Sequence, residues 1–550
     1  MAPELAVRLA TMVRGTLTLS MLIALLAGCP GGSGGYGDMC GGNSDCGKEL
    51  QCLNSRCIER CQRAPDCGDG YACRDGLCKL ATGQPGDVCD SEVQCAPGLS
   101  CQIDGAAVDS EQHLRATCTA ENATRPAGSE CREDGDCRNG TCALGHCVDL
   151  CKETTDCPRG TLCAPSIPSL VSPLSQATFS GCLPDQGYVT WPIPVVSPSA
   201  QILLPVPLGT ASAALVMRVD DDSQKVGASA VISPSGARLY SVPCSPHQIS
   251  DPPCDDVAAN DMYFAAPVRH LPAFGQSVLS MPSGAAAPPL PSGVYRIDVS
   301  SFRADDSPGS AIPRVNAVIQ LSPNGVFLDL HFFFLDLSDH PCTTMLGEPA
   351  LDQATAQEAS FFQADYLGEL HAVFQRAQIE LLNKTYEDIK DHPELDGLDL
   401  ADVGSLLKLG KYPTGINVFF VRSLSPIGVQ AFSPNPGPAG LGGTRQSGIV
   451  ISLDTLCYRS WPVLARLTAH HIARYMGLYH NVEPQTALHP GWRDLIDDDD
   501  EGDPTANLMY FSEAKHPSGD TVLRSAGTVL SDGQRAILSR SPVLQSVVSP

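Results

Sequence analysis

The chain has little positive charge and few long apolar runs. Lys and Arg together number 36 against 61 Asp and Glu, which gives a formal net charge of −25. Such a surface repels phosphate backbones, so nucleic acid is not expected as a partner. No segment beyond residue 30 comes close to the roughly 20 apolar residues that span a bilayer. We therefore expect the rest of the chain to be a secreted body with no membrane span.

The one marked apolar run lies near the start, from Leu17 to Ala27, behind Arg8 and Arg14. It is too short to cross a bilayer, which needs roughly 20 residues, and it has the pattern of a secretory signal peptide. The general interpretation is an ordinary signal peptide, after which the cysteine at residue 29 occurs by chance.

The end of this segment reads Leu-Ala-Gly-Cys at residues 26–29, which resembles a bacterial lipobox. The resemblance implies a lipoprotein signal peptide over residues 1–28 and a lipid on Cys29, with the membrane as a partner through that lipid. Residues 29–39 are then a flexible, glycine-rich tether. The expected location is the bacterial cell envelope, facing the periplasm or the cell surface.

Cysteine is abundant, at 25 residues, and its distribution is regular. Apart from Cys29 the number is even, which in an exported chain predicts complete pairing in disulfides. Twenty of them, within residues 40–184, form five groups of four: Cys40/46/52/57, Cys61/67/73/78, Cys89/95/101/118, Cys131/137/142/147 and Cys151/157/163/182. Of the remaining four, Cys244 and Cys254 are expected to close a loop, and Cys342 and Cys457 are a pair by elimination.

Each group begins with a gap of five residues, and an acidic residue usually precedes the second cysteine. The segment C-R-E-D-G-D-C-R-N-G-T-C, which starts at Cys131, resembles the Dickkopf-type cysteine-rich pattern. Groups this small cannot build an apolar core, so disulfides must hold them. Zinc is the alternative, but the gaps are not C-x-x-C and histidine is scarce. The spacing leaves open the pairing within a group, and whether the repeats form a spacer or bind a partner.

Residues 187–322 alternate short β-type runs with turns rich in Pro, Gly and Ser, which predicts an antiparallel β-sandwich. This alternation of short runs and turns resembles the jelly-roll accessory domains of secreted bacterial proteases. The runs begin at Gln201, Ala214, Ala230, Gly293 and Asn316. The acidic segment Asp220–Asp222 is read as a solvated turn, with calcium binding as the alternative.

Residues 326–550 have the pattern of an α+β domain. The predicted elements are a strand at 326–335, a helix at about 354–384, a buried strand at 415–421, an edge strand at 447–452, a helix at about 462–476 and a last helix at 530–538.

The sequence of residues 470–480, H-H-I-A-R-Y-M-G-L-Y-H, resembles the metzincin zinc-protease motif H-E-x-x-H-x-x-G-x-x-H. His470, Gly477 and His480 stand at matching positions, with Gly477 placed to end the helix and return the chain. His471 replaces the catalytic Glu, and Arg474 replaces the second zinc-binding His. Further on, Asn-Leu-Met-Tyr resembles the metzincin Met-turn, which implies that Met509 lies beneath the site.

The two departures remove the parts on which zinc hydrolysis depends. Arg474 stays protonated and cannot ligate, so His470 and His480 are left as remnant ligands. His471 has no metal-bound water to deprotonate. No cofactor is expected, although His489 is a conceivable substitute ligand, and zinc belongs to the enzyme alternative. Residues Asp497–Asp500 are read as a solvated acidic loop, with calcium as the alternative.

The sequence thus predicts a multidomain protein: disulfide-rich small repeats, an antiparallel β-sandwich, then an α+β metzincin-like domain. The first functional hypothesis is a lipid-anchored surface protein whose degenerate protease-like domain binds a peptide or protein. A divergent zinc endopeptidase that acts on extracellular protein is the alternative. A purely structural or adhesive surface protein is the second alternative.

Overall fold

The computed structural model divides into two units by its internal contacts, Met1–Thr82 and Gly83–Pro550. Cys29, the predicted signal peptide, Cys244, Cys254, His489 and the loop Asp497–Asp500 lie outside the described residues. The described residues are 39–41, 43–47, 50–53, 56–59, 61, 71–74, 77–109, 112–170, 177–241, 268–270, 272–282, 290–321, 326–335, 337, 342, 346–426, 428–434, 436–480, 506–510, 513–515, 521–523 and 527–545. Within these ranges, no helix is both long enough and apolar enough to cross a membrane.

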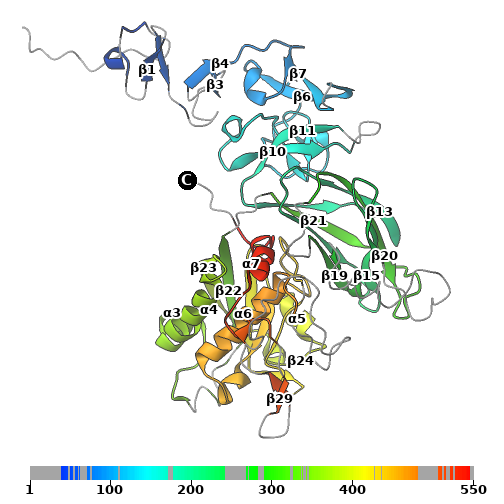
Figure 1. Cartoon of the computed structure of the whole chain (residues 1–550), viewed down its shortest axis with the longest axis vertical. Helices are drawn as coiled ribbons and strands as arrows, with labels where there is room; N and C mark the ends of the chain where they lie inside the picture. Colours follow the sequence, from blue (N-terminus) through cyan, green and yellow to red (C-terminus); the bar gives the residue numbers. More distant parts are fainter. Residues whose placement is uncertain are drawn as a thin grey trace, which may run out of the picture. The chain divides into compact units, whose positions relative to one another are not determined.

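In the unit Met1–Thr82, the first two cysteine groups each contain a β-hairpin (Figure 1). Strand β1 (Leu50–Leu53) pairs antiparallel with β2 (Arg56–Glu59), and β3 (Tyr71–Arg74) pairs with β4 (Leu77–Leu80). The disulfides Cys40–Cys52 and Cys46–Cys57 tie the first hairpin to the turn before it.

The three cysteine groups of the unit Gly83–Pro550 have the same connectivity. In each group the first cysteine bonds to the third and the second bonds to the fourth, which decides the pairing that the spacing left open. The bonds are Cys89–Cys101, Cys95–Cys118, Cys131–Cys142, Cys137–Cys147, Cys151–Cys163 and Cys157–Cys182. The strands are β5 (Val88–Cys89), β6 (Leu99–Val108), β7 (Leu114–Ala120), β8 (Cys142–Ala143), β9 (His146–Cys147), β10 (Thr161–Pro168) and β11 (Thr178–Pro184).

The acidic residue that precedes the second cysteine has a structural role. The Asp136 carboxylate accepts the backbone N–H of Arg132 at 2.9 Å, and the Asp156 carboxylate accepts that of Lys152 at 2.9 Å. Each bond spans the short turn between the first and second cysteines, so it holds the two sulfur atoms in position. The regular acidic signal in the sequence therefore reflects turn geometry.

Two antiparallel sheets follow and enclose one apolar core, as expected for this segment. The first has the order β12-β21-β14-β19-β17, and the second has the order β13-β20-β15-β16 with β18 beside β15. All five predicted runs lie in strands. The bounds are β12 (Tyr188–Ile193), β13 (Ser199–Val206), β14 (Ser212–Arg218), β15 (Lys225–Ile232), β16 (Arg238–Ser241), β17 (Arg269–His270), β18 (Ala273–Phe274), β19 (Gln276–Met281), β20 (Gly293–Phe302) and β21 (Arg314–Gln320).

The C-terminal region has a five-stranded sheet of order β23-β22-β25-β28-β27, in which only β27 runs antiparallel to its neighbour. The strands are β22 (Phe327–Leu335), β23 (Glu380–Ile389), β25 (Ile416–Val421), β27 (Ala431–Phe432) and β28 (Ile449–Ser452), with the separate pairs β24 (Gly397–Asp399)/β26 (Ser423–Ser425) and β29 (Glu513–Lys515)/β30 (Thr521–Leu523). The predicted strands at 326–335 and 415–421 are confirmed.

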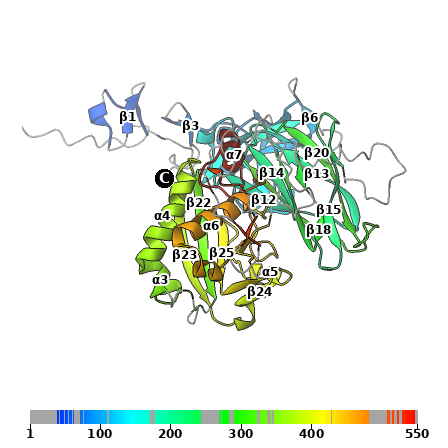
Figure 2. The same cartoon turned by 60° about the horizontal axis from the view of Figure 1, so that its bottom comes forward.

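Helices cover both faces of this sheet, as Figure 2 also shows. Alternate side chains of β22, such as Phe332 and Phe334, pack in one core with α3, α4, α6 and α7, while Phe333 packs with α5 on the opposite face. The helices are α3 (Gln353–Glu358), the π-helical segment η6 (Phe361–Tyr366), α4 (Leu367–Gln375), α5 (Val403–Leu407), α6 (Trp461–Tyr475) and α7 (Asp532–Ser539).

Two sequence predictions in this region are wrong. The helix expected to continue to residue 384 ends at Gln375, because the chain turns at Gln378 (φ 59°) and then pairs in parallel with β22. Tertiary pairing thus overrides the helical spacing. The strand at 447–452 is not an edge strand: β28 lies between β25 and β27, and the two-residue β27 forms the edge. The sequence of β27 is too short to give a periodic signal.

The disulfide connectivity is testable with one substitution. Cys137→Ser should release a single thiol at Cys147, and it should lower the free energy of unfolding by about 3 kcal/mol, a typical value for a loop of this size. Alkylation in denaturant without reductant, followed by peptide mass spectrometry, identifies the labelled cysteine. Labelling at Cys142 or Cys131 would contradict the observed pairing.

Candidate functional site

Helix α6 carries His470, His471 and Arg474 on its last turns. It begins after Ser460 with Pro462 in its first turn, where the missing N–H of proline costs nothing. At its end Gly477 adopts φ +116°, and the Leu478 N–H donates to the Ala473 carbonyl at 3.0 Å. This turn reverses the chain and brings the His480 ring to 5.2 Å from the His470 ring, nearly parallel to it.

The buried ring of His470 is held by the segment around Leu508. Its Nδ1 lies 2.8 Å from the Leu508 carbonyl oxygen, so Nδ1 carries the proton. Leu508 and Met509 are fully buried, and the Asn507 side chain accepts the Met509 N–H at 2.8 Å. Gln534 of α7 exchanges two hydrogen bonds with Asn507 at 3.1 Å. The closing helix therefore holds the turn that supports His470.

His471 points to a different neighbour. Its Nδ1 lies 2.9 Å from Oγ of Ser433, which directly follows the edge strand β27. Its Nε2 is buried and has no hydrogen-bond partner. The ring centroids of His470 and His471 are 5.3 Å apart and the ring planes are inclined at 73°. The two consecutive histidines therefore contact different partners. A buried nitrogen without a partner is costly, which makes it a candidate contact for a bound polar group.

Arg474 and His480 contact each other directly. The Arg474 Nη1 lies 2.9 Å from Nδ1 of His480 and also contacts its Nε2. A guanidinium can only donate, so a lone pair of the imidazole accepts. Arg474 therefore engages a His480 nitrogen that would otherwise be available to bind a metal.

The β-sandwich contributes a residue to the site that no sequence pattern indicates. Arg269 of β17 is buried, donates from Nη1 to the Gly477 carbonyl, and stacks with its Cζ 3.2 Å from the centroid of the Tyr479 ring. Both contacts fix the turn between α6 and His480. No spacing or motif connects Arg269 or Ser433 with residues 470–480, so only the tertiary structure could identify them.

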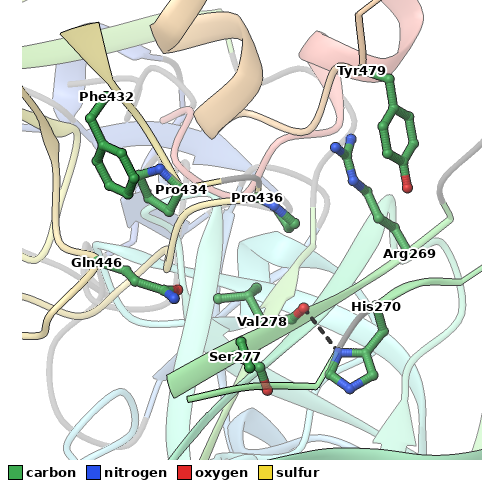
Figure 3. Close-up of a pocket in the computed structure, with 10 residues that line it drawn as sticks. Arg269, His270, Ser277, Val278, Phe432, Pro434, Pro436, Gln446 and Tyr479 are labelled. Carbon is green, nitrogen blue, oxygen red and sulfur yellow. Dashed lines mark hydrogen bonds between the residues drawn. The ribbon is translucent and has the colours of Figure 1, made fainter. Parts of the chain in front are cut away.

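A cavity of about 180 Å³ lies beside this turn (Figure 3). The figure shows Arg269 beside Tyr479 on one side, Phe432 and two prolines on another, and His270 bonded to the Val278 carbonyl. The wall combines apolar and aromatic side chains with the polar groups of an arginine, a histidine, a serine and a glutamine. It is lined by Arg269, His270, Ala273, Ser277, Val278, Phe432, Pro434, Pro436, Gln446 and Tyr479.

The three motif histidines are held neutral. Burial, with the nearby Arg474 cation, lowers the pKa of His470 to about 4. Burial and the same cation lower the pKa values of His471 and His480 well below the ordinary histidine value, and Arg269 adds to the effect on His480. At neutral pH the site is therefore a set of uncharged imidazoles next to guanidinium groups.

These residues do not fit a catalytic zinc ion. Such a site needs three protein donors that converge on one point. Arg474 has no lone pair to offer, and a lone pair of His480 accepts from it. Among the described residues, every group of three or more candidate ligand atoms within 4.8 Å of one another includes disulfide-bonded cysteines, and none includes a motif histidine. The arrangement can exchange hydrogen bonds with a polar group, but it cannot polarise a water as a metal does.

The acidic segment at 220–222 has protein partners for all its carboxylates. Asp220 pairs with Arg314 at 2.6 Å, Asp222 pairs with Arg445, and Asp221 accepts from the Ser223 hydroxyl at 2.6 Å. These contacts agree with the turn interpretation of the sequence.

Comparison with known proteins gives a limited result. No known family profile matches the chain. Over 106 residues the chain is 29% identical to a turripeptide OL55-like protein of Lophiotoma acuta. The matched segment makes up 19% of this chain and 98% of that relative. The similarity to a cysteine-rich peptide agrees with the disulfide-bonded repeats. Together with the disulfides it indicates an extracellular type of protein, because such bonds persist outside the reducing cytosol.

The neutral histidines predict a loss of stability in acid. Their unfolded-state pKa is about 6.5, so protons bind to the unfolded chain first and stability falls as the pH drops from about 6.5 toward 4. For His470, whose pKa is about 4, the loss between pH 7 and pH 5 is about 2 kcal/mol. Urea unfolding across this range measures it.

His470→Gln should make that fall shallower by the share of one histidine, because His471 and His480 remain. His113→Gln, at an exposed histidine, is the control. An equally steep fall in the His470→Gln variant would show that this ring does not resist protonation in the folded state.

Proposed function

We propose that the chain is an extracellular, lipid-anchored protein whose region 326–550 descends from a metzincin-like protease and now binds a peptide or protein without zinc chemistry. The observation that carries the proposal is the contact of Arg474 with His480, because it engages a nitrogen that a metal would need. The disulfide-bonded repeats and the lipobox-like sequence at Cys29 support an extracellular, anchored location.

The relation to metzincins rests on the order of parts. A helix with His470, a glycine turn, a returning His480 and a buried Met509 follow one another in the C-terminal region. The hydrogen bond from His470 to the Leu508 carbonyl brings the Met-turn-like segment directly against the motif helix. These features support a protease-like scaffold in which the changes at residues 471 and 474 are local.

Binding of an extended peptide is supported by the edge of the sheet. The outer side of β27 has no strand partner among the described residues, and its Phe432 lines the 180 Å³ cavity. An unpaired edge offers backbone hydrogen bonds, and a neighbouring pocket offers side-chain selectivity. The unpartnered Nε2 of His471 lies on the helix behind this edge.

Metal analysis of the full chain tests the loss of zinc chemistry. The native protein should contain well under one zinc per chain and leave casein intact. Arg474→His should bind about one zinc, because it frees His480 and restores a third donor. The double variant Arg474→His, His471→Glu should also cut casein in a chelator-sensitive way.

His471→Glu alone is the matched control, because it restores the base but not the ligand, and it should show neither property. Stoichiometric zinc with chelator-sensitive cleavage in the native chain would replace the proposal with the endopeptidase alternative.

Peptide display on the full chain tests the binding function. Selected peptides should lose about tenfold or more in affinity in Phe432→Asp, because the substitution removes an apolar contact and adds charge at the pocket. Leu208→Asp, at an exposed leucine of the sandwich, is the control and should bind normally. If no peptide is enriched, the structural or adhesive alternative is favoured.

A further inference from the structure

A second cavity, of about 160 Å³, lies where the β-sandwich meets the loop before β28. Its wall is unusually rich in charge for so small a space. Four cationic side chains line it, with two carboxylates: Arg218, Arg314, Lys408, Arg445, Asp220 and Asp222. It shares no lining residue with the cavity near the degenerate motif.

Strand register forces two of the cations together. Arg218 of β14 lies directly opposite Arg314 of β21 in the antiparallel pair. Side chains opposite each other project from the same face, and like charges in that position are destabilising. A fold that keeps this pair needs negative charge nearby.

The protein supplies only part of that charge. Asp220 pairs with Arg314 at 2.6 Å, and Asp222 pairs with Arg445. Within the part of the chain that the structure describes, neither Arg218 nor Lys408 forms an ion pair, and the Nε of Arg218 is buried with no hydrogen-bond partner. Four cations against two carboxylates give the wall an excess of two positive charges, in a chain of net charge −25.

Burial and the charge of Arg314 lower the pKa of Arg218, and the nearby Asp220 carboxylate opposes this shift only in part. A guanidinium nevertheless stays protonated in proteins, so the cost is not relieved by loss of the proton. An external anion would relieve it.

The remaining walls are preorganised and allow close approach. Gly275 and Gly443 line the cavity without side chains. Thr444 is fixed by the Gln276 amide at 3.1 Å and by Ser447 at 2.6 Å. The cavity is open to solvent on one side, and it has room for a small anion with some water.

We infer that this cavity is a binding site for a tetrahedral oxyanion, a phosphate or sulfate group, held between Arg218 and Lys408. The planar guanidinium offers paired N–H donors to two oxygens, and the ammonium supplies a second charge. The group is either the free ion or the terminal group of a larger extracellular molecule. Because the anion bridges Arg218 on the sandwich and Lys408 next to α5, its binding also strengthens the contact between these parts.

Equilibrium dialysis of the full chain against inorganic phosphate, inorganic sulfate and methyl phosphate, at constant ionic strength, tests the inference. At least one probe should bind saturably at one site. Arg218→Gln and Lys408→Gln should each weaken binding by about tenfold or more, the loss expected for a charged hydrogen bond. Arg238→Gln removes an exposed arginine from the other sheet and should bind like the native chain.

A second readout separates anion binding from a merely structural role of Arg218. Without anion, Arg218→Gln should unfold at the same temperature as the native chain or higher, because the repulsion from Arg314 is gone. A lower unfolding temperature would mean that Arg218 has structural partners, and it would count against the inference.

The three probes also identify the source of the anion. Methyl phosphate that binds as tightly as phosphate supports a terminal group of a larger molecule, whereas binding of the free ions alone supports a free anion. No saturable binding of any probe, or undiminished binding in Arg218→Gln, would overturn the inference.

Discussion

The contact of Arg474 with His480 determines what the motif region can do. A guanidinium cannot give up its proton or offer a lone pair, so it turns a potential ligand into a hydrogen-bond acceptor. Its charge also helps to keep His470 and His471 neutral in their buried positions. The result is a compact polar site that is still organised by the helix, the glycine turn and the buried Met509 segment, but whose chemistry is that of hydrogen bonding.

The site depends on two parts of the unit Gly83–Pro550. Arg269 of the sandwich holds the Gly477 carbonyl and the Tyr479 ring, and sandwich residues such as Tyr188 and Val318 belong to the same core as the C-terminal sheet. The sandwich is therefore packed against the C-terminal region through apolar surface and polar contacts. The cavities of about 180 Å³ and 160 Å³ both have walls from these two parts, where ligand sites commonly occur.

Much of the fold could be predicted from local pattern. Strongly apolar runs such as Phe327–Leu335 and Ile416–Val421 are strands, and the segment from Pro462 is a helix that ends before a glycine. The prediction failed where long-range pairing competes with local spacing. Residues 380–384 fit a helical repeat, but they pair with β22, and the two-residue β27 is recognisable only because β28 lies beside it.

The sequence by itself determined the composition of the site: which residues follow one another on α6 and where the glycine after the helix lies. It also determined that the cysteines come in groups of four, because their spacing is written directly in the chain. Only the tertiary structure decided how those cysteines pair, that Arg474 bonds to His480, and that Arg269 and Ser433 reach the motif. The physical reason is that spacing along the chain fixes neighbours within a turn or a helix. Contacts between residues that lie far apart in sequence depend on how sheets and helices pack.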